Sequence, residues 1–136
     1  MGAAKHVKDL MSRDVKTVGR NDRLTLADEL MSQGPMRHLP VVDDDGELAG
    51  LLSQRDMYRD ALRRMLGYGE HAQDRLYDQL LVKEVMSTDV FTIAPDAPLR
   101  EAAERMLAER IGCLVVVRNG KIEGILTEGD FVRAAV

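Results

Sequence analysis

The sequence of 136 residues predicts an α+β fold built from two copies of one α-β-α-β-β-α repeat. The first observation is internal repetition, because residues 7–18 match residues 82–93 at a constant offset of 75 positions. The second is a pair of short apolar, β-branched runs in each half, which are typical of strands. The third is that apolar residues recur at helical spacing before and after those runs. An internal repeat that covers most of a chain decides the fold class before any single element does.

The first half opens with a predicted helical turn at residues 7–12 and an extended segment at 14–18. Asn21 or Asp22 then caps a helix, and a Gly-Pro pair ends it. The apolar positions of this helix are Leu24, Ala27, Leu30 and Met31. Their spacing places them on one face, which predicts that this face packs inward.

A β-hairpin follows in the first half. Strands are predicted at residues 39–42 and 48–52, with an Asp-rich turn at 43–46 between them. Pro40 lacks a backbone donor, so we expect it at the start of its strand or on an edge. The three consecutive aspartates lack the spaced ligands of a calcium loop, which favours an exposed turn over a metal site. A helix over residues 56–66 completes the repeat.

The segment between the halves, residues 67–81, has no counterpart in the second repeat. Its apolar spacing predicts a linker helix over residues 72–81. The second repeat follows the plan of the first, with Pro98 at the start of a helix and an Asn-Gly hairpin turn at 119–120. The predicted domains are a first repeat (1–66), a linker (67–81) and a second repeat (82–136), which together form one module.

Composition is that of an ordinary water-soluble globular protein, with 45% apolar and 31% charged residues. The net charge is −4 and the basic residues are dispersed. Proteins that bind nucleic acid through its phosphates usually carry a basic stripe. Nucleic acid is therefore an unfavoured partner. Cys113, the single cysteine, has no intramolecular disulfide partner and is predicted to be a buried thiol. With no membrane-spanning run or signal peptide in the sequence, a cytoplasmic protein with no membrane partner is expected.

Residues suited to catalysis are scarce. His6, His38 and His71 share no zinc-type spacing with one another or with Cys113. The sequence has no P-loop and no glycine-rich dinucleotide motif after a predicted strand. We therefore expect a non-enzymatic protein with no catalytic residue, no metal site and no obligatory cofactor.

One motif occurs twice, as residues 50–56 and 124–130: a glycine, two apolar residues, Ser or Thr, two variable residues and an aspartate. It places the hydroxyl where a strand runs into a helix, so that it can cap the first helical turn. The free N–H groups and the helix dipole at such a junction also favour an anion such as phosphate. The aspartate could accept two hydrogen bonds from a sugar diol. A capping box without a ligand explains a single copy more simply, but the repetition adds weight to ligand binding.

Three motifs, in order and in both halves, resemble the tandem CBS (cystathionine beta-synthase) domain pair, or Bateman module. They are Met-Ser-x-Asp-Val-x-Thr-Val/Ile at the start of each repeat, the Leu-Pro-Val-Val-Asp strand at residues 39–43, and the repeated Gly-to-Asp motif. The resemblance covers roughly residues 7–62 and 82–136. It implies two repeats packed through their sheets with pseudo-twofold symmetry, and two clefts for AMP, ADP, ATP or S-adenosylmethionine. It further implies a homodimer with a regulatory, energy-sensing role toward a protein target that the sequence does not identify.

The resemblance also assigns residues to the two clefts. In one cleft Thr127 would face phosphate and Asp130 the ribose. The opposite repeat would add Val15, Thr17, Asp22, Ala27, Met36 and Arg37. The mirror cleft would use Ser53 and Asp56, with Val90, Thr92, Ala97, Ala102, Ile111 and Gly112 opposite. The charge of Arg37 favours the Thr127 cleft as the occupied one.

Two other functions remain open at the level of sequence. One is a structural or protein-interaction dimer with empty clefts, which Ala97 and Gly112 keep open because they stand where polar ligands are wanted. The other is the binding of single-stranded nucleic acid or RNA, which scarce aromatic residues and net negative charge disfavour.

Overall fold

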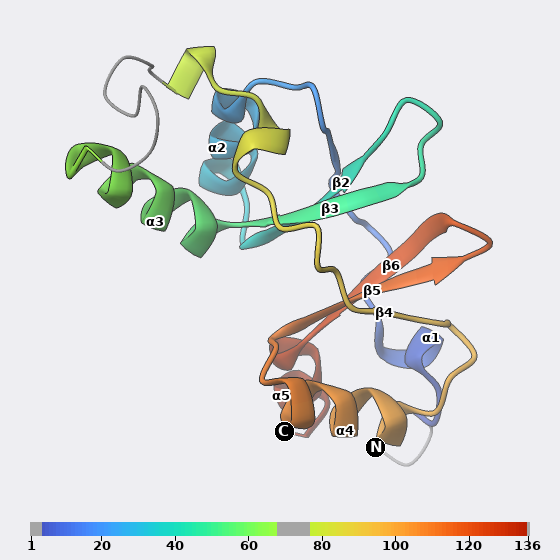
Figure 1. Cartoon of the computed structure of the whole chain (residues 1–136). Coiled ribbons are helices and arrows are strands. Elements are labelled where there is room, and N and C mark those ends of the chain that lie inside the picture. The colour runs from blue at the N-terminus through green and yellow to red at the C-terminus, as the bar shows by residue number, and fades with distance from the viewer. Residues whose placement is uncertain (1–3, 68–76, 136) are drawn as a thin grey trace. The chain divides into compact units, whose positions relative to one another are not determined.

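The computed structural model of this chain describes residues 4–67 and 77–135. Helices and two three-stranded sheets succeed one another along these residues, which confirms the α+β class (Figure 1). The chain divides into two compact units. We call Lys16–Asp89 the N-terminal unit, and Met1–Val15 together with Val90–Val136 the C-terminal unit.

The N-terminal unit contains a sheet of order β1-β2-β3. Its strands are β1 (Val18–Gly19), β2 (His38–Val42) and β3 (Leu48–Ser53), and its α-helices are α2 (Leu24–Gln33) and α3 (Gln54–Met65). β1 runs parallel to β2 but pairs only with Val41 and Val42, whereas β3 pairs antiparallel along the whole of β2. At Pro40 the side of β2 away from β3 is therefore an edge, as expected for a residue without an N–H donor.

The C-terminal unit repeats this plan. It contains α1 (Val7–Leu10), β4 (Thr92–Ile93), α4 (Leu99–Glu109), β5 (Cys113–Arg118), β6 (Lys121–Thr127) and α5 (Glu128–Ala135). The pairing of Ile93 with Val116 repeats that of Val18 with Val41, and both hairpins carry a register shift just after these positions. Asn119 and Gly120 both have positive φ, at 51° and 80°, which confirms the predicted Asn-Gly turn.

The predicted linker helix over 72–81 is wrong in the part that can be compared, and its residues 72–76 lie outside the described chain. Residues Tyr77–Gln79 form a 3₁₀ turn, and a second 3₁₀ turn spans Val82–Glu84. Between them Leu80 is fully buried and Leu81 pairs with Arg23 as an isolated β-bridge. A β-bridge needs an extended backbone, so core packing and bridge pairing override the helical spacing of the apolar residues.

The opening segments of the two repeats are exchanged. We define them as residues 4–15 and 80–89. In the first, Val7 N–H donates to Ala97 C=O at 2.9 Å and Ser12 bridges to Ile125. In the second, Val82 N–H donates to Asp22 C=O at 2.9 Å and Ser87 bridges to Leu51. The predicted boundaries 1–66, 67–81 and 82–136 follow the sequence repeat, whereas the compact units follow this exchange.

Each unit has its own core, and the exchanged segment supplies part of it. Leu80 and Val82 are fully buried among Leu24, Leu39 and Leu52 in the N-terminal unit. In the C-terminal unit, buried Val7 and Met11 pack with Leu114, Val116 and Leu126. Among residues 4–67 and 77–135, no helix has the length and apolar character needed to cross a bilayer.

Candidate ligand-binding site

The repeated motif forms a strand-to-helix junction in each unit. In the N-terminal unit β3 ends at Ser53 and α3 begins at Gln54. Ser53 Oγ accepts from Asp56 N–H at 3.0 Å, and Asp56 Oδ2 accepts from Ser53 N–H at 3.0 Å. This reciprocal pair is a capping box, so the capping interpretation of the motif is confirmed at this junction. At the other junction, between β6 and α5, Asp130 Oδ2 accepts from Thr127 N–H at 2.9 Å.

The glycine of the motif is explained by the exchange of opening segments. A Cβ atom on Gly50 would lie 2.6 Å from Met86 Sδ and 2.8 Å from Ser87 O. On Gly124 it would lie 2.6 Å from Met11 Sδ and 2.8 Å from Ser12 O. Backbone oxygens cannot retreat from such a contact without disturbing the β-bridge that they support. Gly50 and Gly124 are therefore needed so that the opening segment of the other repeat can pack closely.

The carboxylate of Asp130 is buried and engaged on both oxygens. Its side chain is 6% exposed. Oδ2 accepts from Thr127 N–H and, at 3.4 Å, from Thr127 Oγ1. Oδ1 accepts from Arg133 at 2.5 Å and from Ser12 Oγ at 3.4 Å, and Ser12 belongs to the exchanged opening segment. A buried carboxylate needs such partners, because an unpaired charge away from water is costly.

Asp56 has fewer partners than Asp130. It is half-buried, and among the described residues its carboxylate is engaged only through Oδ2. Ser87, the sequence counterpart of Ser12, accepts a hydrogen bond on Oγ from Asp89 N–H at 3.3 Å. Arg59, the counterpart of Arg133, is exposed and forms no ion pair with Asp56 in the part of the chain that the structure describes. The two junctions thus share a backbone plan but differ in the hydrogen-bond partners of their aspartates.

The loop before each central strand lies against the junction of its own unit. Gln54 N–H donates to Arg37 C=O at 2.9 Å, and Glu128 N–H donates to Gly112 C=O at 3.1 Å. Met36 and Arg37 therefore lie beside Ser53, in the same unit. Ile111 and Gly112 lie beside Thr127 in the other unit. The guanidinium of Arg37 is exposed and donates to Met36 C=O at 3.0 Å.

The remaining predicted site residues are distributed over both units. The N-terminal unit holds Thr17, Asp22 and Ala27, and the C-terminal unit holds Val15, Val90, Thr92, Ala97 and Ala102. Ala27 and Ala102 are fully buried in the cores of their units. Asp22 caps its own turn, since its Oδ2 accepts from Gly19 N–H at 2.6 Å. Thr92 C=O accepts from Arg105 at 2.6 Å. Each predicted cleft combines residues of the two units, and its assembly stays a prediction.

Sequence reasoning missed three residues at the Thr127 junction: Ser12, Glu128 and Arg133. Arg133 stands three positions after Asp130, a spacing that brings two side chains together on a helix and could have been noticed. A Cβ on Gly112 would lie 2.7 Å from Glu128 Oε1, so this carboxylate packs directly over the glycine. Ser12 carries no such signal, because its contact with Asp130 arises only from the exchange.

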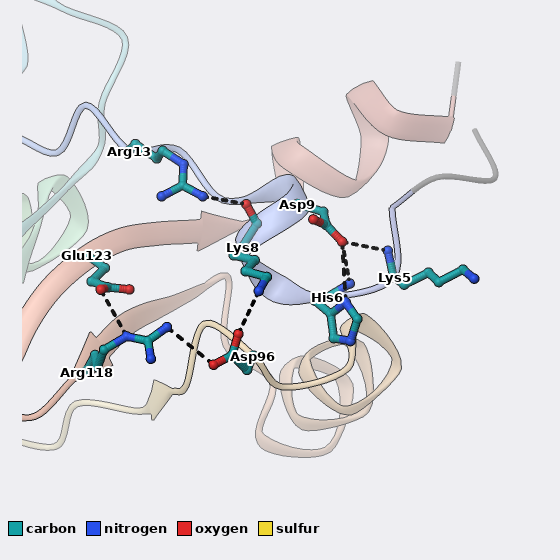
Figure 2. Close-up of polar contacts among 8 residues, drawn as sticks. All are labelled: Lys5, His6, Lys8, Asp9, Arg13, Asp96, Arg118 and Glu123. Carbon is teal, nitrogen blue, oxygen red and sulfur yellow. Dashed lines mark hydrogen bonds and ion pairs between the residues drawn. The ribbon is translucent and has the colours of Figure 1, made fainter.

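The first opening segment is also held by charged contacts, drawn in Figure 2. Lys8 Nζ pairs with Asp96 Oδ1 at 2.9 Å, and Arg118 pairs with Asp96 Oδ2 at 3.3 Å and with Glu123 at 3.1 Å. The hydrogen bond from Lys8 is the main cause that lowers the pKa of Asp96, and Arg118 adds to it. We call Lys8, Asp96 and Arg118 the clasp.

Cys113 is buried at the start of β5, and burial, followed by the charge of Asp130, raises the pKa of its thiol to about 12. Such a thiol is a poor nucleophile, as expected from the sequence. Within residues 4–67 and 77–135, no three His, Cys, Asp or Glu side chains are grouped so as to hold a metal ion.

Comparison with known proteins decides the family. The model of the CBS domain matches residues 7–67 and 82–136, once for each repeat. The chain belongs to the CBS-domain family. A CBS domain-containing protein of Bacillus subtilis, YhcV, is 36% identical over 124 residues, which cover 91% of this chain and 81% of that protein. A CBS domain-containing protein of Dictyostelium discoideum is 32% identical over 129 residues, which cover 93% of this chain and 88% of that protein.

Solved structures of CBS pairs match in fold over almost the whole chain. The CBS domain pair of protein MJ0100, in complex with 5-methylthioadenosine and S-adenosyl-L-methionine, has a TM-score of 0.78 at 27% identity and covers 96% of this chain and 94% of its own. CBSX2 in complex with AMP also has a TM-score of 0.78 at 27% identity, covering 96% of this chain and 95% of its own. Similar CBS pairs thus bind adenosyl compounds.

Proposed function

We propose that this CBS pair is a non-catalytic regulatory module that binds an adenosine nucleotide (AMP, ADP or ATP) or S-adenosylmethionine. The observation that carries the proposal is the strand-to-helix junction, formed twice, in a chain whose structural neighbours hold AMP and S-adenosyl-L-methionine. Each junction offers a hydroxyl at a helix start, where the helix dipole favours a phosphate. Each also offers an aspartate three residues later, suited to a ribose diol.

The predicted site residues take the following roles in this proposal. Ser53 and Thr127 lie at the helix starts and bind phosphate, while Asp56 and Asp130 bind ribose. Apolar side chains, with Val15, Met36 and Ile111 foremost, form flat walls for the adenine base. The ligand regulates by binding one arrangement of the two units more tightly than another, which shifts the population toward that arrangement.

Isothermal titration of nucleotide-free protein with AMP, ADP, ATP and S-adenosylmethionine tests the proposal. Binding of at least one compound with micromolar affinity, lost when Asp56 and Asp130 are both changed to Asn, supports an adenosyl-binding module. The Asn side chain keeps an oxygen that can accept from the Ser53 or Thr127 N–H, so the caps survive in the variant. Absence of binding by all four compounds, with protein that unfolds cooperatively, rejects it.

A second candidate function is a protein-interaction module that works through α3. Tyr58, Leu62 and Met65 of α3 and Leu66, which follows the helix, are 60%, 66%, 78% and 68% exposed, and they recur at helical spacing. Exposed apolar side chains in one stripe mark an interaction surface. A second copy of this chain would satisfy the expected homodimer. Light scattering of wild-type protein and Leu62→Glu tests this: a dimer that dissociates on substitution supports it, and a monomeric wild type rejects it.

A further inference from the structure

The two strand-to-helix junctions differ in charge and in the number of hydrogen-bond partners of their aspartates. Resting on the proposed function, we propose that the Ser53–Asp56 junction is the stronger site for a phosphate-bearing adenosine ligand. The Thr127–Asp130 junction is the weaker site. Ser12 and Arg133 already bond to its aspartate, and Glu128 adds negative charge. The preference expected from sequence, which favoured the Thr127 cleft on account of Arg37, is thereby reversed.

The first argument is the state of the two carboxylates. Asp130 Oδ1 is held by Arg133 at 2.5 Å and by Ser12 at 3.4 Å, and its side chain is 6% exposed. A sugar diol could bind there only by displacing partners that already satisfy the carboxylate. Asp56 uses Oδ2 for the capping box, and within the described residues its Oδ1 has no partner to displace. The free energy of a new hydrogen bond to Asp56 is therefore not offset by the loss of an old one.

The second argument, independent of the first, is charge. At the Ser53 junction the side chains at equivalent positions are Arg37, Gln54 and Arg55, of which two are cationic. At the Thr127 junction they are Gly112, Glu128 and Gly129, of which one is anionic, and the cation Arg133 at this junction is already paired with the Asp130 carboxylate. The backbone contacts of Arg37 with Gln54 and of Gly112 with Glu128 place the main chain of each set at its own junction. A phosphate ligand is attracted by the first set and repelled by the second.

The third argument concerns Glu128 alone. A Cβ on Gly112 would lie 2.7 Å from Glu128 Oε1, so the carboxylate lies directly against this loop residue and adds negative charge there. At the matching position of the other repeat stands Gln54, which is neutral. The variant Glu128→Gln therefore gives the Thr127 junction the side chain that the Ser53 junction already has.

The test is isothermal titration of the full chain with AMP and, separately, with adenosine, which lacks the phosphate. Asp56→Asn is expected to weaken the tighter AMP-binding step about tenfold or more, since a charge-assisted hydrogen bond is lost. Asp130→Asn is expected to affect only the weaker step. Arg55→Gln should weaken AMP binding about two- to fivefold and leave adenosine binding unchanged, because an exposed cation near phosphate contributes modestly. Glu128→Gln should strengthen the weaker AMP step.

The outcomes separate this inference from the proposed function. If Asp130→Asn removes the tighter step and Asp56→Asn does not, the assignment of the stronger site is wrong while nucleotide binding stands. If Arg55→Gln weakens adenosine and AMP alike, the phosphate argument is wrong. If wild-type protein binds neither AMP, ADP, ATP nor S-adenosylmethionine, the proposed function fails, and this inference with it. Thermal unfolding of each variant shows whether a lost step reflects a lost fold.

Discussion

The hydroxyl of Ser12 donates a hydrogen bond to the carboxylate of Asp130, 118 positions later in the chain. This contact exists because the first opening segment packs on the second repeat and bridges to β6 through Ile125. The partner of Asp130 on its own helix, Arg133, completes the same environment. A substitution of Ser12 therefore changes the hydrogen bonding of Asp130 at the start of α5.

The motif glycines provide the sharpest test of the exchange. Gly124→Ala places a Cβ 2.6 Å from Met11 Sδ and 2.8 Å from Ser12 O, so the opening segment must move. Overpacking of this kind costs about 1–3 kcal/mol of unfolding free energy. Urea unfolding followed by circular dichroism measures the change, and Gly50→Ala should behave alike because its contacts with Met86 and Ser87 are the same.

Gly129→Ala is the matched control. A Cβ atom on Gly129 would lie 3.1 Å from the flexible end of Arg133, its nearest neighbour, and the residue lies inside α5. An alanine in a helix is favoured over glycine by about 1 kcal/mol, so this variant should be neutral or more stable. Equal destabilisation by Gly124→Ala and Gly129→Ala would contradict the close approach of the opening segment.

Much of the fold could be predicted from the sequence because the evidence is local. The Asn119–Gly120 turn and the hydroxyl cap of Ser53 depend on residues within a few positions of one another, and the repeat is visible when the two halves of the sequence are compared. The exchange could not be predicted, since Val7 and Met11 in one opening segment are matched by Val82 and Met86 in the other. Either segment carries the side chains that either core needs.

The linker helix was predicted but is wrong in the residues that can be compared. Its apolar spacing indicates a helix, yet Leu80 enters the core of the N-terminal unit and its C=O accepts from Leu24 N–H at 2.8 Å. Tertiary burial decided the backbone there, and local spacing carries no information about which core a leucine will join. The difference between the partners of Asp56 and Asp130 could not be predicted either, because Ser12 reaches Asp130 only through tertiary packing.

The cap of α3 gives a second prediction. Ser53→Ala removes the oxygen that accepts from Asp56 N–H, and we expect a loss of about 1 kcal/mol of unfolding free energy. Ser53→Thr keeps the acceptor oxygen and should retain most of the stability. The control is Ser32→Ala, at an exposed position of α2, where a change within about 0.5 kcal/mol is expected. A Ser53→Ala variant as stable as the control would show that the cap contributes nothing.

Cys113 predicts a dependence of stability on alkaline pH. Burial raises the pKa of its thiol from 9.0 to about 12, so the folded protein keeps a proton that the unfolded chain loses. The unfolding free energy should therefore fall as pH rises from about 9 toward 12, and this contribution is fully present below 9. Urea unfolding at pH 8 and pH 10 measures the fall. In Cys113→Ala the fall should be smaller, because the thiol that loses its proton in the unfolded chain is absent. An identical fall would exclude the thiol as its cause.

The clasp predicts a dependence on salt and acid at the N-terminal end of the chain. Asp96→Asn removes the partner of Lys8 and Arg118, so hydrogen exchange at the amides of Val7 and Lys8, which bond to Ala97 and Pro95, should speed up at low salt. At 1 M salt the difference should shrink, because exposed ion pairs are screened. The pKa of Asp96 is lowered from 3.8, chiefly by the hydrogen bond from Lys8. The protection it provides is therefore present above 3.8 and is lost as pH falls through the lower folded value.

Glu104→Gln is the control for the clasp. Glu104 pairs with Arg100 along α4 at 2.9 Å, is similarly exposed and does not touch the opening segment. Its loss should leave exchange at Val7 and Lys8 unchanged at every salt concentration. If Asp96→Asn and Glu104→Gln accelerate exchange equally, the effect comes from net charge and not from the clasp. If Asp96→Asn alone does so, the charged contacts hold the opening segment that brings Ser12 to Asp130.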